Sequence, residues 1–397
     1  MSEATFLEKL LDLSARQAVG RQEDGEVCLS GRQVVWVSLG NDQFFEIANR
    51  GRRPVKASLR IPGETPYHGA NNVQDHVEGH THDGEFVLIA EDGSASLEQY
   101  SIQYVVGKFW ANNHVHVVGG KGSVNTRYLY HLLCTVNFIP FLSGGGRAKL
   151  TKGKLVEIPI PIPCPENPEK SLAIQAEIVR ILDTFTELTA ELTAELTARK
   201  KQYNYYRDQL LTFKDGEVEW KTLGEVYKFQ YGMGNTIPTL GGEYPIYGSN
   251  GIVGAHNEFN SEDSPVIGHI GAYAGIVNWG KGKHFVTYNG VICRLISERV
   301  SSKYAYYQLL KQDFNSMAKS ASHPFVSYAE LNKVLIPIPS PSEQASIVAI
   351  LDKFDTLTHS ISEGLPREIE LRQMQYEYYR DLLLNFPKPE PQTERVA

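Results

Sequence analysis

The sequence contains the same helical block twice, and this duplication constrains the fold more than any other feature. One copy runs from "IPIPIPCPENPEKSLAIQAEIVRILDTFTEL" to "QYNYYRDQLLTF", and the other from "IPIPSPSEQASIVAILDKFDTL" to "QYEYYRDLLLNF". Each opens with an Ile-Pro alternation, which predicts an extended segment because proline biases its predecessor away from helical conformations. Long helices of equal length are predicted next, over residues 168–213 and 341–386. Gly364 and Pro366 predict a bend near residues 363–366 of the second helix.

Both predicted helices carry start signals and an apolar stripe. Asn167 can cap the first helix, with Pro168 at its first position, and Ser340 with Glu343 forms a capping box at the second. Apolar residues then recur at spacings of three and four, which places them on one face. They are Ile178, Leu182, Phe185, Leu188, Leu192 and Leu196 in the first helix, and Ile347, Ile350, Leu351, Phe354 and Leu357 in the second. Two such helices are most simply buried against each other, antiparallel if a two-fold axis relates the copies.

The duplication extends beyond the helices. The segments "TRYLYHLLCTVNF" and "SKYAYYQLLKQDF" lie at the same distance ahead of the two Ile-Pro blocks, and each predicts a helix. Further upstream, "TPYHGANN" resembles "EYPIYGSN", and "WANNHVHVV" resembles "TYNGVICRL". Residues 15–157 and 217–333 are therefore predicted to be diverged copies of one domain, rich in glycine, tyrosine and short β-branched runs.

Composition excludes several classes of protein. The 397 residues are 42% apolar and 21% charged, which is enough to bury more than one core. No apolar run reaches the ~18 residues of a membrane-spanning helix, and "MSEATFLEKLLDLSARQ" has acidic residues where a signal peptide is basic. The four cysteines lack the spacing of zinc ribbons or disulfide frameworks. We expect a cytoplasmic protein without membrane contact, and its net charge of −7 restricts any DNA contact to local basic patches.

The sequence offers no catalytic motif. It has no N-P-P-[YFW] or D-P-P-Y methyltransferase loop, no G-x-x-x-x-G-K-[ST] loop for ATP, and no G-x-G-x-x-G fingerprint. We therefore predict that the chain has no catalytic residues, binds no cofactor, and is not itself an enzyme.

In their order and duplication, these motifs resemble the specificity subunits of type I restriction-modification systems, of the subfamily with a TAEL tetrapeptide repeat in the central helix. The resemblance covers nearly the whole chain and is carried by the paired "IPIP", "ILD-x-F" and "QY-x-YYRD" segments, by "YGSNGIVG" and by "TAELTAEL". It implies an α+β fold in which two α/β target recognition domains are separated by two long antiparallel helices that form a coiled-coil rod. The implied parts are a first recognition domain (1–157), a central helical region with the TAEL repeat (158–216), a second recognition domain (217–333) and a C-terminal helical region (334–397).

The resemblance also implies a function. The chain would recognise a bipartite, interrupted target in double-stranded DNA and would dock two modification subunits, which are methyltransferases, and the restriction/translocase subunits. S-adenosylmethionine, ATP and Mg are expected on those partners. Each tetrapeptide adds about one helical turn, ~6 Å, which is on the order of one or two base-pair steps. The repeat, with spacer residues Thr189, Leu192, Thr193 and Leu196, is therefore expected to set the spacing between half-sites. Neutral repetition of good helix formers is the alternative.

Candidate DNA-binding residues come from a basic cluster and from turns. Arg and Lys fix a protein on phosphates, and Asn can bond adenine in the major groove. The segment "ANRGRRPVKASLRI" supplies the cluster, and "NWGKGKHF" is expected to place lysines on a Gly-rich loop. The candidates are Arg50, Arg52, Arg53, Lys56, Arg60, His68, Asn71, Asn72, Asn113, Tyr247, Ser249, Asn250, Lys281, Lys283 and Asn289. Basic clusters are also often solvated faces, and Asn is a common turn residue.

The "QYNYYRD" and "QYEYYRD" segments lie near the C-terminal ends of the two predicted helices. Aromatic residues and Arg concentrate at protein interfaces, so a segment that occurs twice suits two identical partner subunits. The docking candidates are Tyr203, Tyr206, Arg207, Tyr376, Tyr379 and Arg380. The alternative is that these side chains cover the ends of the helices against the domains.

Two other functions remain open. The segment "DHVEGHTHDGE" brings His76, His80 and His82 close to Asp75, Glu78 and Asp83, and His114 alternates with His116. Imidazole and carboxylate groups can hold zinc or iron, as in a metal-dependent hydrolase or oxygenase. The second half has only the widely spaced His256, His269 and His284, which disfavours a duplicated metal site, and a solvated loop is the other interpretation. The remaining alternative is a structural tether whose two domains bind something other than DNA.

Overall fold

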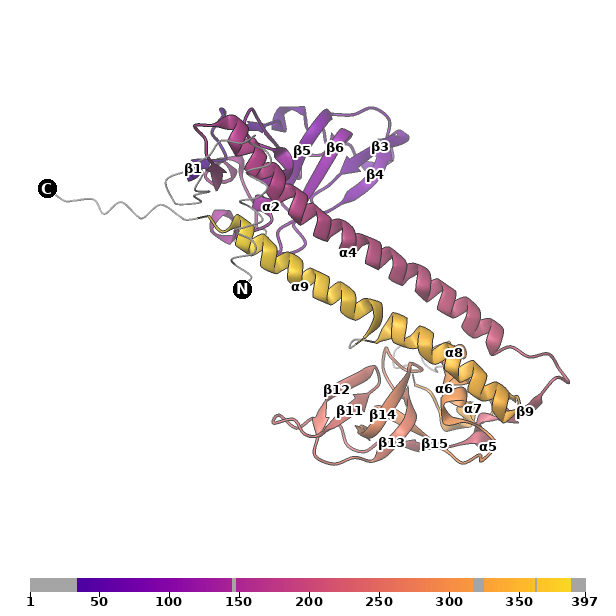
Figure 1. Ribbon diagram of the computed structural model, residues 1–397. Coiled ribbons are helices and arrows are strands. Elements are labelled where there is room, and N and C mark those ends of the chain that lie inside the picture. The colour runs from indigo at the N-terminus through magenta and orange to yellow at the C-terminus, as the bar shows by residue number, and fades with distance from the viewer. Residues whose placement is uncertain (1–33, 145–147, 317–324, 361–362, 387–397) are drawn as a thin grey trace, which may run out of the picture. The chain divides into compact units, whose positions relative to one another are not determined.

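The computed structural model describes residues 34–144, 148–316, 325–360 and 363–386 (Figure 1). The chain divides into two compact units, one formed by Met1–Ala190 with Glu370–Ala397 and the other by Glu191–Ile369. Each unit holds one sheet-rich domain, and the long helix α4 (Pro168–Leu210) separates the two domains along the chain. The predicted α+β class is therefore confirmed. The acidic N-terminal segment "MSEATFLEKLLDLSARQ" lies outside the described residues, and none of the described helices is long and apolar enough to cross a membrane.

The first unit contains a six-stranded sheet in the order β2-β7-β5-β6-β3-β4, in which β3 and β6 run parallel and the other neighbours antiparallel. Before α4 its elements are β1 (Val34–Ser38), β2 (Phe45–Ile47), η1 (Asn49–Gly51), η2 (Ala57–Leu59), β3 (Pro62–His68), β4 (Val73–Val77), β5 (His82–Ala90), β6 (Ile102–Ala111), β7 (Val115–Gly120), α2 (Thr126–Leu133), η3 (Ile139–Phe141), α3 (Lys152–Leu155) and β8 (Pro159–Pro163). The core includes Val87 and Ile89 of β5 and Tyr128 and Leu129 of α2, all fully buried.

The second unit repeats this topology. Its sheet has the order β10-β15-β13-β14-β11-β12, again with one parallel pair, β11 and β14. Its elements are β9 (Glu219–Thr222), α5 (Leu223–Val226), β10 (Tyr227–Tyr231), β11 (Tyr244–Gly248), β12 (Gly251–His256), β13 (Ser261–Gly268), β14 (Val277–Val286), β15 (Gly290–Leu295), α6 (Ser302–Lys311), α7 (Tyr328–Leu331), β16 (Leu335–Ile338), α8 (Pro341–His359) and the start of α9 (Gly364–Leu384). The two domains are therefore copies of one fold, as the internal repeat predicts.

A glycine bends one long strand in each sheet. Gly107 in β6 and Gly282 in β14 have φ angles of +79° and +60°, which glycine adopts without strain. In the first domain, His68 pairs with Ala111 at the end of β6, and its ring also bonds Gln103 near the start of that strand (2.9 Å), so β6 must be strongly curved. The expected Gly-rich loop at "NWGKGKHF" is therefore wrong, because these residues form strand β14 with a bend.

The Ile-Pro segments form short strands beside the helices. β8 pairs with β1, and β16 pairs with β9, both antiparallel. The hydroxyl of Tyr128 in α2 donates to the Pro161 carbonyl (3.1 Å), and the hydroxyl of Tyr304 in α6 donates to the Pro337 carbonyl (2.9 Å). The predicted extended conformation is confirmed, and the same hydrogen bond fixes it in both units.

The helix starts also follow the sequence signals. The Lys170 N–H donates to the Asn167 side chain (3.0 Å), and the Glu343 N–H donates to the Ser340 hydroxyl (3.3 Å). α4 is a single helix that includes the whole TAEL repeat. The second helical region is broken rather than bent, since α8 ends at His359 and α9 begins at Gly364, whose φ angle is +75°. The chain crosses from one unit to the other at residues 190 and 369, and both crossings lie inside helices. The four-part division at residues 157, 216 and 333 stays a prediction.

The two long helical regions pack in antiparallel pairs within each unit. In the first unit Phe185 of α4 stacks on Tyr379 of α9, with ring centroids 5.1 Å apart and planes at 19°. In the second unit Tyr206 of α4 stacks on Phe354 of α8, at 5.8 Å and 27°. Each contact joins the Phe of an "ILD-x-F" segment to the last Tyr of a "QY-x-YYRD" segment. The duplicated sequence therefore makes the same helix contact twice.

A buried glutamine joins α4 to the domain of the first unit. Gln175 is fully buried, donates to the Ser123 carbonyl (2.8 Å) and accepts from the Asn125 N–H (2.8 Å) at the start of α2. Two turns further along α4, Asp183 accepts from Arg127 and His131 of α2 at 2.8 Å. Burial raises the pKa of Asp183, but the hydrogen bonds from Arg127 and His131 together outweigh it and hold the pKa below its usual value.

The second unit has the same anchor. Gln344 of α8 donates to the Arg299 carbonyl (3.1 Å) and accepts from the Ser301 N–H (2.8 Å) at the start of α6. Asp352, the counterpart of Asp183, accepts from the Tyr307 hydroxyl (2.5 Å) and pairs with Lys303 (3.3 Å). We call these two sets of contacts, around Gln175 with Asp183 and around Gln344 with Asp352, the helix anchors.

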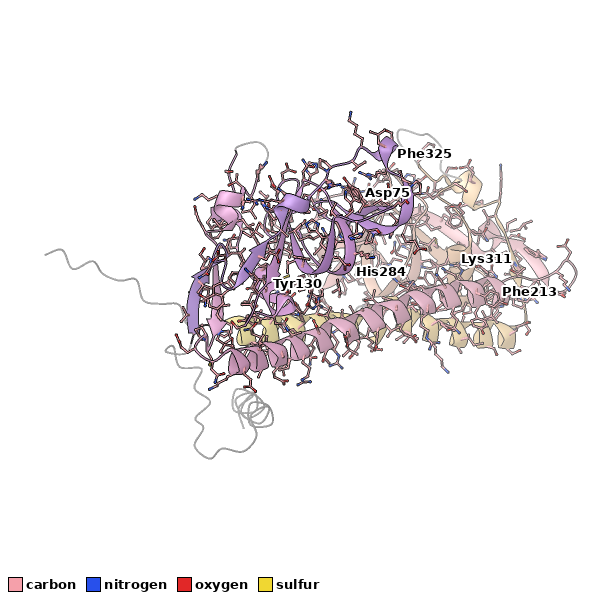
Figure 2. All side chains as sticks on the ribbon, turned by 90° about the horizontal axis from the view of Figure 1, so that it is seen from above. Asp75, Tyr130, Phe213, His284, Lys311 and Phe325 are labelled. Atoms are coloured by element: carbon pink, nitrogen blue, oxygen red, sulfur yellow. The ribbon has the colours of Figure 1, made fainter. Side chains whose placement is uncertain are left out.

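The end of α4 is also held in the second unit. The Lys311 ammonium group at the end of α6 donates to the Leu211 carbonyl (3.0 Å) and to the Thr212 hydroxyl (2.8 Å), beside Phe213 (Figure 2). α6 is therefore bonded to α8 through the helix anchor and to the end of α4 through Lys311.

Replacing Gln344 with alanine is expected to destabilise the second unit by about 2 kcal/mol, because the Ser301 N–H and the Arg299 carbonyl lose their partner. Gln175→Ala should act equally on the first unit. Urea unfolding, with hydrogen exchange to assign the loss to one unit, measures both. Gln373→Ala, on an exposed position of α9, is the control and should stay within about 0.5 kcal/mol of the parent. Unfolding midpoints of Gln344→Ala and Gln373→Ala that agree would contradict the anchor.

Candidate nucleic-acid interface

Three turns meet at one place in the first domain. The Asn112 N–H, after β6, donates to the His68 carbonyl at the end of β3 (3.2 Å). The Asn71 side chain donates to the Gly93 carbonyl after β5 (2.9 Å), and the Glu91 N–H donates to the His114 carbonyl (2.8 Å). The structure thus brings together the turns that carry the predicted residues His68, Asn71, Asn72 and Asn113.

These four side chains differ in what they present to solvent. Asn72 and Asn113 are exposed. The Asn71 amide holds the neighbouring loop, since it donates to Gly93 and accepts from the Ala95 N–H (2.8 Å). His68 is 6% exposed and bonds Gln103, and burial lowers the pKa of its ring. Asn72 and Asn113 are therefore the two of this group best placed for an outside partner.

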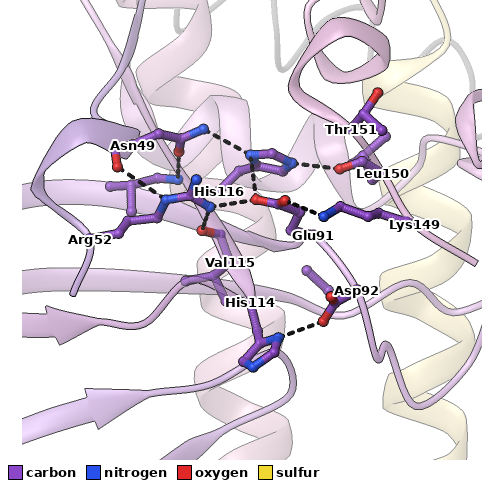
Figure 3. Close-up of polar contacts among 12 residues, drawn as sticks. Asn49, Arg52, Glu91, Asp92, His114, Val115, His116, Lys149, Leu150 and Thr151 are labelled. Atoms are coloured by element: carbon purple, nitrogen blue, oxygen red, sulfur yellow. Dashed lines mark hydrogen bonds and ion pairs between the residues drawn. The ribbon is translucent and has the colours of Figure 1, made fainter. Parts of the chain in front are cut away.

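The basic cluster divides into structural and exposed members. The Arg52 guanidinium lies 2.6 Å from the Glu91 carboxylate and donates to the Val115 carbonyl at 2.7 Å (Figure 3). Lys149 pairs with the other oxygen of Glu91 at 2.9 Å. Burial raises the pKa of Glu91, but the hydrogen bonds from Arg52 and Lys149 outweigh it, and the pKa lies below its usual range. Arg52 thus links the segment after β2 to the loop after β5.

A buried histidine belongs to the same network. One ring nitrogen of His116 lies 2.9 Å from the Asn49 side-chain nitrogen, and the other lies 2.7 Å from the Leu150 carbonyl (Figure 3). Burial lowers the pKa of His116, which favours the neutral ring.

Of the other members of the basic cluster, Arg60 has partners within the domain, and three side chains are exposed. Arg60 lies over the Tyr67 ring, 4.0 Å from its centroid, and pairs with Asp75 at 3.3 Å. Arg50, Arg53 and Lys56 are exposed. The Arg53 N–H donates to the Ala111 carbonyl (3.0 Å), which places this segment beside the turn that carries Asn113.

Corresponding turns meet in the second domain. The Ser249 hydroxyl lies 2.9 Å from the Asn289 carbonyl and 3.0 Å from the Ile270 carbonyl, and so joins three turns. Asn250, next to it, is exposed. Tyr247 is buried, and its hydroxyl donates to the Trp279 carbonyl (3.2 Å). Ser249 and Tyr247 thus shape the turns, and Asn250 presents its side chain outward.

The lysines lie at the bend of β14. Lys281 and Lys283 flank Gly282, both exposed, and the Lys283 ammonium lies 4.6 Å from the centroid of the Phe259 ring. Lys108 follows Gly107 as Lys283 follows Gly282. It occupies the corresponding position in the first domain, and the sequence reading missed it. The shared "GK" dipeptide at the start of "GKF" and "GKHF" was the available signal.

The predicted docking tyrosines are partly used inside the units. Tyr203 is 4% exposed and lies against Phe354, and Tyr376 and Tyr379 are half-buried. Tyr206 is 41% exposed although it stacks on Phe354. The most exposed tyrosines of the two segments are Tyr205 (61%) and Tyr378 (50%), which sequence reasoning did not select.

The histidine-rich segment "DHVEGHTHDGE" does not form the expected solvated loop. Most of it lies in strands β4 and β5. His82 is buried, with one ring nitrogen 2.9 Å from the Ala48 carbonyl and the other 2.7 Å from the Thr81 hydroxyl. His76 and His80 are exposed. Across the ranges that the structure covers, no three His, Cys, Asp or Glu side chains are grouped to hold a metal ion, so the metal-enzyme alternative gains no support.

Comparisons with known proteins agree with the sequence features. The sequence model of the family described as "Type I restriction modification DNA specificity domain" matches residues 34–199 and 216–371. The chain is 45% identical to a putative type I restriction enzyme specificity subunit of Haemophilus influenzae, over 96% of this chain and 98% of that protein. It is 36% identical to the type I restriction enzyme EcoR124I/EcoR124II specificity subunit of Escherichia coli, over 98% of this chain and 99% of that protein.

A solved structure has the same fold. The crystal structure of the type I restriction-modification system S subunit from M. genitalium matches with a TM-score of 0.64 at 16% identity, over 94% of this chain and 99% of that chain. The two matched regions of the family together cover both domains and most of the helix between them. The chain therefore belongs to the family of type I restriction modification DNA specificity domains.

Proposed function

We propose that this chain is the non-catalytic subunit that selects the DNA target of a type I restriction-modification enzyme. Each domain would recognise one half of a bipartite, interrupted site in double-stranded DNA. The observation that carries this proposal is the duplication of one fold whose helix anchors are the same in both copies while the turns carry different residues. Two domains with the same sheet and helix anchors but different turn residues suit a target made of two different half-sites.

The chemistry would be done by partner subunits. Two modification subunits would bring S-adenosylmethionine, and restriction/translocase subunits would bring ATP and Mg, because the sequence lacks the loops for these groups. Such an assembly would act on chromosomal DNA in the cytoplasm.

We place the docking of the modification subunits at the "QY-x-YYRD" segments. Their geometry is the same in the two units: the Tyr205 and Tyr206 rings meet at 5.4 Å and 75°, and the Tyr378 and Tyr379 rings at 5.3 Å and 75°. Each segment ends in an Arg-Asp pair, Arg207 with Asp208 and Arg380 with Asp381. Two equal surfaces with exposed tyrosines suit two identical partners.

The TAEL repeat is proposed to set the distance between half-sites. It lies within the uninterrupted helix α4, and the boundary between the two units falls inside it, at residue 190. Leu192 and Leu196 are half-buried while the intervening positions are mostly exposed, so a unit of four residues can be removed without loss of the apolar face.

Deleting one unit, Thr189 to Leu192, is expected to keep half-sites unchanged and to shorten the spacer. Four residues turn a helix by about 400°, so the apolar face keeps its approximate direction, while the helix loses ~6 Å, comparable to one or two base-pair steps. Sequencing of methylated adenines in a host that carries the chain and its modification subunits measures the target. Thr193→Ala, which keeps the length, is the control and should leave the spacer unchanged. A deletion variant that folds and methylates at the original spacing would rule out this role.

Two neighbouring arginines should separate stability from DNA binding. Arg52→Ala leaves Glu91 without its closest partner and is expected to destabilise the first unit by about 3 kcal/mol. Arg53→Ala should change stability by less than about 0.5 kcal/mol, but weaken DNA binding and lower its salt slope by about 1. Urea unfolding, and salt titration of DNA binding by the assembled complex, measure the two effects. The reverse pattern would exchange the roles assigned to these residues.

A further inference from the structure

Glu91 in the first domain and His269 in the second occupy the same position. The Glu91 N–H donates to the His114 carbonyl and the His269 N–H donates to the Asn289 carbonyl, both at 2.8 Å. The Glu91 and His269 carbonyls in turn accept from N–H groups of buried residues in the following segment, from Leu150 at 2.8 Å and from Val326 at 3.0 Å. The backbone around these two residues is therefore equivalent, and the side chains can be compared directly.

The side chains around this position are charged or polar in the first domain. Glu91 pairs with Arg52 and Lys149, and Asn49 bonds His116 (Figure 3). The turn beside them carries the exposed Asn113.

The same place is aromatic in the second domain. Tyr231 stacks on Tyr328 at 4.1 Å and 21° and lies 4.3 Å from the His269 ring, centroid to centroid. The Tyr288 ring meets His269 at 5.7 Å and Tyr231 at 5.8 Å. Phe325 forms an isolated antiparallel β-bridge with Ile270, and Lys149 forms the corresponding β-bridge with Asp92. The second domain therefore has an aromatic side chain at the position where the first domain has a lysine.

The outer members of this aromatic group are open to solvent. Tyr288 is 46% exposed and Phe325 is 36% exposed, and Tyr273, on the same loop as His269, is 51% exposed. They lie beside Asn289 and Ser249, in the group of turns described above. Packing of the core does not require exposed rings, whereas a protein that contacts base edges uses apolar groups against the thymine methyl.

We propose that Tyr288 and Phe325 contact the C5 methyl groups of thymines in the half-site that the second domain recognises. In the first domain the matching positions are polar: Asn113 would bond a base edge, and Lys149 pairs with Glu91. This inference rests on the proposed function, and it adds the chemical group that the aromatic surface recognises. At this equivalent position, the second domain would contact DNA through apolar groups and the first domain through polar groups.

The test is binding of the complete complex, the chain with its modification subunits, to a DNA duplex that contains its target. Each thymine of the second half-site is replaced in turn by deoxyuridine, which lacks only the methyl group. At least one replacement should weaken binding about fourfold, the effect of one buried methyl group. In Tyr288→Ala or Phe325→Ala that replacement should have no further effect. Asn113→Ala, the matched change in the first domain, should leave the thymine sensitivity unchanged.

Other outcomes overturn the proposal in distinct ways. Specific binding that is insensitive to every deoxyuridine replacement refutes the thymine contact and leaves the proposed function intact. Loss of the modification subunits from Tyr288→Ala, with unchanged sensitivity of the complex that remains, assigns the aromatic surface to a protein partner. Absence of sequence-specific binding by the unsubstituted complex refutes the proposed function itself.

Discussion

The helix anchors are the contacts on which the rest of this structure depends. Gln175 and Gln344 are buried side chains whose amides satisfy backbone groups at the start of α2 and α6. A buried amide without these partners costs more free energy than the hydrogen bonds contribute. α4 therefore has one favourable position on the first domain, and α8 has one on the second. Because α4 begins in one unit and ends in the other, any role of its length in spacing requires that it is held in both units, by Gln175 in the first and by the Lys311 contact in the second.

The duplication separates what both copies need from what only one needs. Both units keep the buried glutamine, the aspartate two turns later, the tyrosine bonded to the Ile-Pro strand and the glycine that bends the long strand. The differences gather at the turns, where one domain has the Arg52–Glu91–Lys149 network and the other the Tyr231–His269–Tyr288 group. The frame is thus held by contacts that are repeated, and the recognition surface is free to differ.

The sequence predicted the elements whose signals are local. Helix periodicity, the Asn167 cap and the Ile-Pro strands depend on neighbouring residues only, and the structure confirms them. The strand at "NWGKGKHF" was missed because a bend at Gly282 depends on pairing with β13. Arg52 could not be distinguished from Arg53, because the partner that occupies it, Glu91, is remote in sequence. Which of the exposed turn residues touch DNA stays a prediction for the same reason, since the partner is another molecule.

The most direct test of the account is an exchange of the second domain. Residues 217–333 would be replaced by the matching domain of the Haemophilus influenzae relative, and methylated adenines would be sequenced in a host that carries the modification subunits. The account predicts that one half of the bipartite target changes while the other half and the spacer stay the same, because α4, α8 and the whole first domain are kept. A target in which both halves change, or neither, would contradict the claim that each domain recognises one half-site.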